Sequence, residues 1–165
     1  MIKLLKWFGN NWNYNKEKIE ISRRLFIFQP AIFIIMSGQI TPHFSTKEMK
    51  CPESGICEMD DFFMNLLERI RIEFNQPMIV TSGFRSKKYN EAISKTGKDG
   101  PHTTGKAADF LICGLPADNL ISIAKRFGIS GIGIKQHGPY NKRFIHLDCL
   151  ANSDKHPRPI LWTYP

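Results

Sequence analysis

The chain has 165 residues, of which 42% are hydrophobic, and this is enough to build the core of one domain. Its formal net charge is +8. Residues 1–35 carry six Lys or Arg and two Glu, a net +4, which leaves +4 for residues 36–165. A basic surface favours an anionic partner, but zinc-finger spacing, an aromatic RNA-binding signature and a long Lys/Arg tract are all absent, so we expect no nucleic-acid partner.

The N-terminal segment differs in character from the rest of the chain. Its apolar stretch, Leu25 to Met36, is about 12 residues long, whereas a membrane span needs about 20, so we expect no stable membrane span. Two interpretations remain open: Met36 is the true initiator, or the stretch is the core of a signal or anchor. Under either, we predict a non-domain leader over residues 1–35 and one domain over residues 36–165.

Hydrophobic periodicity predicts the elements of that domain. Helical spacing of apolar residues predicts a helix from Met59 to Asn75. A strand over Met78–Thr81, a short helix over Lys87–Lys95 and a strand over 107–112 come next. Pro116 and Gly128 bracket a further helix. The last two strands, Ile132–Ile134 and Phe144–Cys149, are predicted to pair as an antiparallel hairpin. The expected class is α+β, a small antiparallel sheet with helices on one face.

Three residues have the chemistry of a zinc site. Zinc accepts imidazole nitrogens and carboxylate oxygens, and a catalytic site uses three protein ligands and leaves a position open for water. His102, Asp109 and His146 would supply that set. Gly105 permits a tight turn between the first two, and the strand after it carries Asp109. Strand alternation places Asp148 on the same face as His146.

These residues lie in three ordered motifs: S-G-F-R-S at 82–86, H-x-x-G-x-A-x-D at 102–109 and F-I-H-L-D at 144–148. Together they resemble the zinc D-alanyl-D-alanine carboxypeptidase family of peptidoglycan peptidases, which shares its fold with the hedgehog signalling domain. The resemblance extends over roughly residues 40–164 and includes a closing Arg158-x-x-Leu-Trp162. It implies that His102, Asp109 and His146 bind zinc and that Arg85, beside Ser82, binds a substrate carboxylate or carbonyl.

The implied reaction is hydrolysis of a peptide bond in the peptidoglycan stem peptide, by a carboxypeptidase or an endopeptidase. The small size suits a phage lysin or tail-associated enzyme, made in the cytoplasm and acting at the cell wall; a secreted or periplasmic enzyme is the alternative. A non-catalytic cell-wall-binding or structural module on the same fold is the competing function.

The general base is the point where the sequence departs from better-known members of that family. Many of them have an acid three residues before the second zinc histidine, or a histidine two residues before it. Here those positions hold Arg143 and Phe144. Asp148 is the best substitute by strand geometry, but it is equally suited to holding His146 in one tautomer. His137, in a loop, is a second candidate for proton transfer.

The remaining chemistry-bearing residues leave alternatives open. The four cysteines form no C-x-x-C pair, so free thiols are the default interpretation. Cys51 and Cys57 bracket a short loop, which would allow a disulfide or part of a second metal site. Trp162 and Tyr164 either line a groove for sugar or peptide or close the core.

Overall fold

The computed structural model describes residues 38–165. The predicted leader over residues 1–35 and the predicted domain start at residue 36 lie outside the described residues and stay predictions. From Gln39 to Pro165 the chain forms one compact unit. Within the described part of the chain, no helix has the length and apolar character needed to cross a membrane.

Four α-helices and seven strands make up this unit. The helices are α2 (Thr46–Met49), α3 (Asp61–Phe74), α4 (Lys87–Ile93) and α5 (Leu115–Arg126). The strands are β1 (Gln39–Thr41), β2 (Phe44–Ser45), β3 (Ile79–Ser82), β4 (Ala107–Leu111), β5 (Gly131–Lys135), β6 (Phe144–Asp148) and β7 (Ile160–Thr163). Short 3-10 turns lie at η1 (Gly97–Asp99), η2 (Pro101–Thr104) and η3 (Tyr140–Lys142).

The two longer helices begin and end within two residues of their predicted bounds. The side chain of Asp60 accepts a hydrogen bond from the backbone N–H of Phe63, 2.9 Å away, and so caps the first turn of α3. The helix ends at Phe74, and the capping residue Asn75 adopts the left-handed conformation with φ 51°. Helix α5 starts after Gly114 with Pro116 in its first turn, and Gly128 follows its end with φ 80°.

The main sheet has the strand order β3-β4-β6-β5-β7. Its first four strands pair antiparallel, which confirms the predicted hairpin of β5 and β6. The edge strand β7 was not predicted, and it pairs parallel to β5. Strands β1 and β2 form a separate small hairpin. The α+β class is confirmed, with one parallel pair in an otherwise antiparallel sheet.

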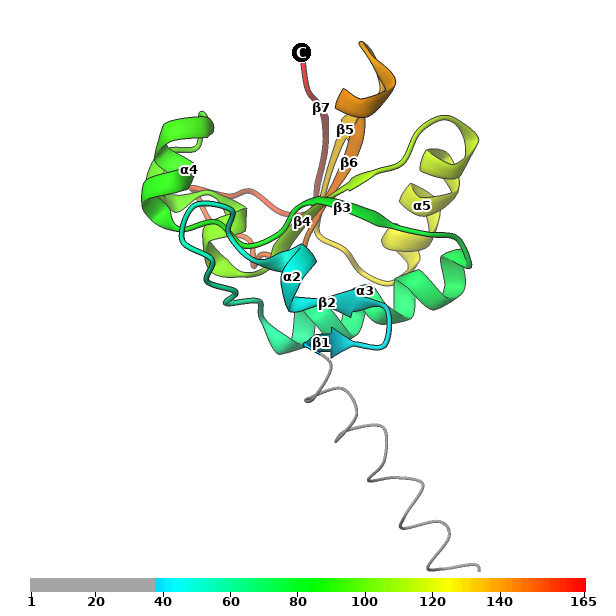
Figure 1. The fold of residues 1–165 in the computed structure, drawn as a ribbon. Coiled ribbons are helices and arrows are strands. Elements are labelled where there is room, and N and C mark those ends of the chain that lie inside the picture. Colours follow the sequence, from blue (N-terminus) through cyan, green and yellow to red (C-terminus); the bar gives the residue numbers. More distant parts are fainter. Residues whose placement is uncertain (1–37) are drawn as a thin grey trace, which may run out of the picture. The chain divides into compact units, whose positions relative to one another are not determined.

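Helices α3 and α5 lie together on one side of the sheet in Figure 1. Their apolar faces pack with alternate residues of β4 and β6, among them Phe110, Ile145 and Leu147, all fully buried. Because side chains alternate across a strand, Asp109, His146 and Asp148 point to the other face. The sheet therefore separates a hydrophobic core from a face that carries the polar residues predicted to form the site.

Candidate functional site

One residue from each strand of the main sheet forms a row across it. Ser82 pairs with Asp109, Asp109 with His146, His146 with Gly133, and Gly133 with Trp162. Paired residues on neighbouring strands lie with their Cβ atoms about 4.5–5.5 Å apart and point to the same face. This register brings the carboxylate of Asp109 directly beside the imidazole of His146.

His102 joins this pair from the η2 turn. One ligand atom from each of His102, Asp109 and His146 lies within 4.8 Å of the other two, and all three residues are buried. The carboxylate lies between the imidazoles: His146 Nδ1 is 2.7 Å from Asp109 Oδ1, and His102 Nε2 is 3.3 Å from Asp109 Oδ2. The structure thus brings together the three residues predicted as metal ligands.

The outer nitrogen of each imidazole is bound to an acceptor. His102 Nδ1 donates to the carbonyl oxygen of Gly83 at 2.8 Å, and His146 Nε2 lies 3.1 Å from Asp148 Oδ2. These contacts hold a proton on each outer nitrogen, and the inner nitrogens, His102 Nε2 and His146 Nδ1, face Asp109. Once His146 Nδ1 gives up its proton, two inward imidazole nitrogens and a carboxylate form a donor set that fits a divalent metal ion.

The electrostatics of the cluster favour a cation at its centre. Burial raises the pKa of Asp109, but His102 and His146 outweigh burial and hold it well below its usual range. Burial lowers the pKa of His146, yet its hydrogen bonds to Asp109 and Asp148 raise it to about 9. Burial holds the pKa of His102 below its usual value, so this imidazole is neutral and able to bind a metal. A proton on His146 Nδ1 and a metal ion compete for the same position.

Arg85 is held against the cluster by its own neighbours. Its Nε donates to Ser82 Oγ at 2.8 Å, and its terminal nitrogens donate to Asn90 Oδ1 at 3.3 Å and Asp109 Oδ2 at 3.1 Å. Each terminal nitrogen of a guanidinium carries a second N–H, so one donor on each stays available for a bound ligand. Ser82 is half-buried and orients the guanidinium that the sequence predicted as a substrate anchor.

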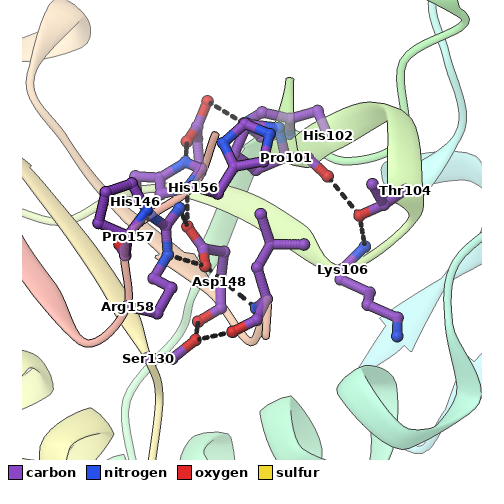
Figure 2. A network of polar contacts seen from close by, with 12 residues as sticks. Pro101, His102, Thr104, Lys106, Ser130, His146, Asp148, His156, Pro157 and Arg158 are labelled. Carbon is purple, nitrogen blue, oxygen red and sulfur yellow. Dashed lines mark hydrogen bonds and ion pairs between the residues drawn. The ribbon is translucent and has the colours of Figure 1, made fainter. Parts of the chain in front are cut away.

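Asp148 is enclosed by partners, as Figure 2 shows. Arg158 binds both of its oxygens, with Nε 2.8 Å from Oδ1 and Nη2 2.6 Å from Oδ2, and His146 occupies Oδ2 as well. The residue is completely buried. Burial raises its pKa, but the hydrogen bonds from His146 and Arg158 lower it to about 2. An enclosed, ionised carboxylate of this kind fixes the orientation of His146.

A pocket of about 620 Å³ opens over the cluster, within the size range of ligand sites. His102, Asp109, His146 and Arg85 all line it. Three aromatic rings continue its wall: His146 and Trp162 have centroids 5.3 Å apart, Trp162 and Tyr164 5.9 Å, and Tyr164 and Phe144 5.0 Å. The sequence allowed Trp162 and Tyr164 either to line a groove or to close the core, and in the structure both line the pocket.

Two glycines of β5 make room for this arrangement. A Cβ atom on Gly133 would lie 2.7 Å from the ring of Tyr164 and 2.8 Å from that of Trp162, closer than side chains tolerate. A Cβ atom on Gly131 would overlap the carboxylate of Asp148. Glycine inside a strand often marks a close approach of this kind, so the sequence Gly131-x-Gly133 carries a signal for the site that the motifs alone do not include.

The other predicted proton-transfer residue lies elsewhere. His137 is exposed, its Nε2 lies 3.2 Å from the backbone oxygen of Tyr164, and it is absent from the described residues that line the pocket. His156, which was not predicted from the sequence, lines the pocket and donates from Nε2 to the backbone oxygen of Asp99 at 2.9 Å. Its position follows from a turn after β6 that has no motif, so only the fold reveals it.

Comparison with protein families matches residues 42–148 to Peptidase M15. Searches of curated proteins and of solved structures find no match. The matched range begins before α2 and ends at Asp148, so it contains Arg85 and all three residues of the metal-binding cluster. Peptidases of this kind depend on a metal and act on peptides, in agreement with the donor set described above. Since the match spans more than half of the chain, the chain belongs to the Peptidase M15 family.

Proposed function

We propose that this protein is a zinc-dependent peptidase that hydrolyses peptide bonds of peptidoglycan stem peptides, as a D-Ala-D-Ala carboxypeptidase or an endopeptidase. The observation that carries the proposal is the cluster of His102, Asp109 and His146 with the guanidinium of Arg85 bound to Asp109 in the same pocket. Zinc suits two imidazoles and a carboxylate, and it leaves a position for water. The basic domain suits an anionic cell wall.

The metal would be held by His102 Nε2, a carboxylate oxygen of Asp109 and His146 Nδ1. When bound, zinc polarises the scissile carbonyl and lowers the pKa of its water ligand toward about 7. Asp148 keeps the proton of His146 on Nε2, and Arg158 holds Asp148 in place. Arg85 directs its remaining N–H groups to a carboxylate or carbonyl oxygen of the substrate.

Peptide hydrolysis also needs a group that takes up a proton and returns it to the leaving amine. Asp148 is poorly suited because both of its oxygens are occupied inside the protein. His156 is the better candidate. Its Nε2–H is bound to the carbonyl of Asp99, so Nδ1 retains a lone pair, and the side chain lines the pocket.

One observation favours a second function, that of a cell-wall-binding module without catalysis. Among the described residues that line the pocket, Asp109 is the only side chain with a carboxylate, and it is already bound by His102, His146 and Arg85. A pocket without a free acid would still bind a peptide. Catalysis then depends on whether His156 transfers protons.

The test uses the purified full chain. Zinc per chain is measured first, followed by cleavage of peptidoglycan and of a stem peptide ending in D-Ala-D-Ala, with chelator and after zinc is added back. If the protein is a zinc peptidase, we expect about one zinc ion per chain and cleavage that the chelator stops. His146→Ala should lose zinc and cleavage together, whereas His137→Ala should keep both. Zinc binding without cleavage would favour the binding module, and the absence of zinc would refute the metal site.

A further inference from the structure

The charges that line the pocket are unbalanced on one side of the metal-binding cluster. Arg85 and Arg158 are ion-paired with Asp109 and Asp148. Lys95 and Lys135 also line the pocket, and within residues 38–165 neither forms an ion pair; Lys95 is exposed, whereas Lys135 is half-buried. A half-buried ammonium without a counter-ion is a favourable place for an anionic group of a ligand.

The sheet register fixes where this ammonium lies relative to the cluster. Lys135 pairs with Phe144, which precedes His146 by two residues on β6 and points to the same face. Since a strand advances about 3.3 Å per residue, Lys135 is displaced from the cluster by roughly 7 Å along the strand. Its Nζ lies 6.0 Å from the centroid of the Phe144 ring.

Arg85 lies on the other side of the cluster along the same axis. Strand β3 runs from Ile79, paired with Leu111, to Ser82, paired with Asp109, and Arg85 follows its end. Beyond Ser82 the chain continues toward the end of the sheet where Ala107 of β4 pairs with Asp148 of β6. This end lies on the opposite side of the cluster from Phe144. A peptide whose C-terminal carboxylate meets Arg85 would therefore extend its N-terminal part toward Lys135.

The wall between the cluster and Lys135 is aromatic. Trp162, Tyr164 and Phe144 form a chain of ring contacts that starts at His146 and ends beside the lysine. Such a wall offers apolar contact to the middle of a ligand and reduces the water around the ammonium. An ion pair formed there contributes more to the free energy of binding than an ion pair at an open surface.

From this arrangement we infer that Lys135 determines specificity: the pocket selects peptides that carry a second carboxylate about two residues N-terminal to the bond that is cut. The inference deepens the proposed peptidase function and rests on it for the position of the bond. An extended peptide also advances about 3.3 Å per residue, so two residues cover the distance from the cluster to Lys135.

The experiment compares two synthetic peptides, acetyl-Ala-Glu-D-Ala-D-Ala and acetyl-Ala-Gln-D-Ala-D-Ala, which differ only in the carboxylate. Binding to the full chain is measured by calorimetry in the presence of chelator, where no turnover occurs, and cleavage is measured separately with zinc. We expect the wild type to bind the Glu peptide about tenfold more tightly. Lys135→Met should reduce that preference to below about twofold, because the neutral side chain retains the length but loses the charge.

Lys125→Met is the matched control, since Lys125 is exposed on α5 and lines a different, smaller pocket. It should leave the preference for the Glu peptide unchanged. Equal binding of the two peptides by the wild type would overturn the inference, as would a preference that survives in Lys135→Met. Preferential binding with no cleavage of either peptide would support the charge preference assigned to Lys135 and refute D-Ala-D-Ala carboxypeptidase activity, so the two failures are distinguishable.

Discussion

Replacing Asp148 with Asn tests the buried pair that supports the metal-binding cluster. The substitution keeps the size of the side chain but removes the charge that faces Arg158 and His146. Arg158 is almost fully buried, with 7% of its side chain exposed, so its charge would lose its partner in a poorly solvated place. The amide nitrogen of Asn would also meet an N–H donor of Arg158 or His146 instead of offering an acceptor.

Two quantities give the size of the effect. Asp148 has a pKa of about 2 in place of its ordinary 3.8, which corresponds to about 2 kcal/mol of stabilisation by the ionised form. Removing one partner of a buried ion pair costs about 3–5 kcal/mol in general. Because Asn retains one acceptor oxygen, we expect Asp148→Asn to lower the free energy of unfolding by about 2–4 kcal/mol at pH 7.

The sign of the pH dependence follows from the same pKa. A carboxyl whose pKa is lowered by folding stabilises the protein above its unfolded pKa of about 3.8, and this contribution is lost as the pH falls through about 2. The difference in the free energy of unfolding between wild type and Asp148→Asn should therefore reach its full value at pH 5 and above and decrease between pH 4 and pH 2.

Urea denaturation of the full chain with chelator present, followed by circular dichroism from pH 2 to pH 7, measures this difference without a contribution from bound metal. Asp154→Asn is the control: Asp154 is exposed, and its substitution should change stability by no more than about 0.5 kcal/mol. The reasoning is refuted if Asp148→Asn unfolds at the same urea concentration as Asp154→Asn at pH 7.

Three further predictions concern the pocket. His156→Gln should lower kcat at least about tenfold while the zinc content stays that of the wild type, whereas the control His137→Gln should leave kcat unchanged. Equal kcat values for the two variants would exclude His156 from proton transfer. Gly133→Ala should lower the free energy of unfolding by about 1–3 kcal/mol in urea denaturation and weaken peptide binding in calorimetry, because the new methyl group displaces Trp162 and Tyr164. Unchanged peptide binding would contradict the close contact of the two rings with β5. Zinc at about a hundredfold excess over its Kd should raise the free energy of unfolding by about 2.7 kcal/mol, and a His102→Ala variant should show no such rise by differential scanning calorimetry.

Much of the fold follows from local patterns in the sequence. Helix α3 has a capping Asp60 and a regular apolar stripe, and β6 alternates apolar and polar residues from Ile145 to Asp148, so both were predicted close to their observed bounds. The grouping of His102, Asp109 and His146 was also predicted, because their motifs are ordered along the chain. For the helix and the strand the information lies within a few neighbouring residues, whereas the grouping of the three ligands rests on the resemblance of three separate motifs to a known family.

The remaining features depend on contacts between distant segments. Strand β7 is short, follows Pro159, and is defined by its parallel pairing with β5, a partner that no local pattern reveals. The ion pair of Arg158 with Asp148 and the position of His156 in the pocket follow from the path of the chain after β6. Arg158 was noticed only as part of a closing motif, without a role.

The row from Ser82 through Asp109, His146 and Gly133 to Trp162 has a consequence for folding. Each strand contributes one residue, and a slip of one position in any pairing would turn that residue to the opposite face of the sheet. A chain with such an error in β4 or β6 would turn Asp109 or His146 toward the core residues and would lack the donor set. Metal binding by the native donor set would therefore select correctly paired molecules from a refolding mixture, and metal-affinity retention would serve as a direct measure of the fraction with native strand register.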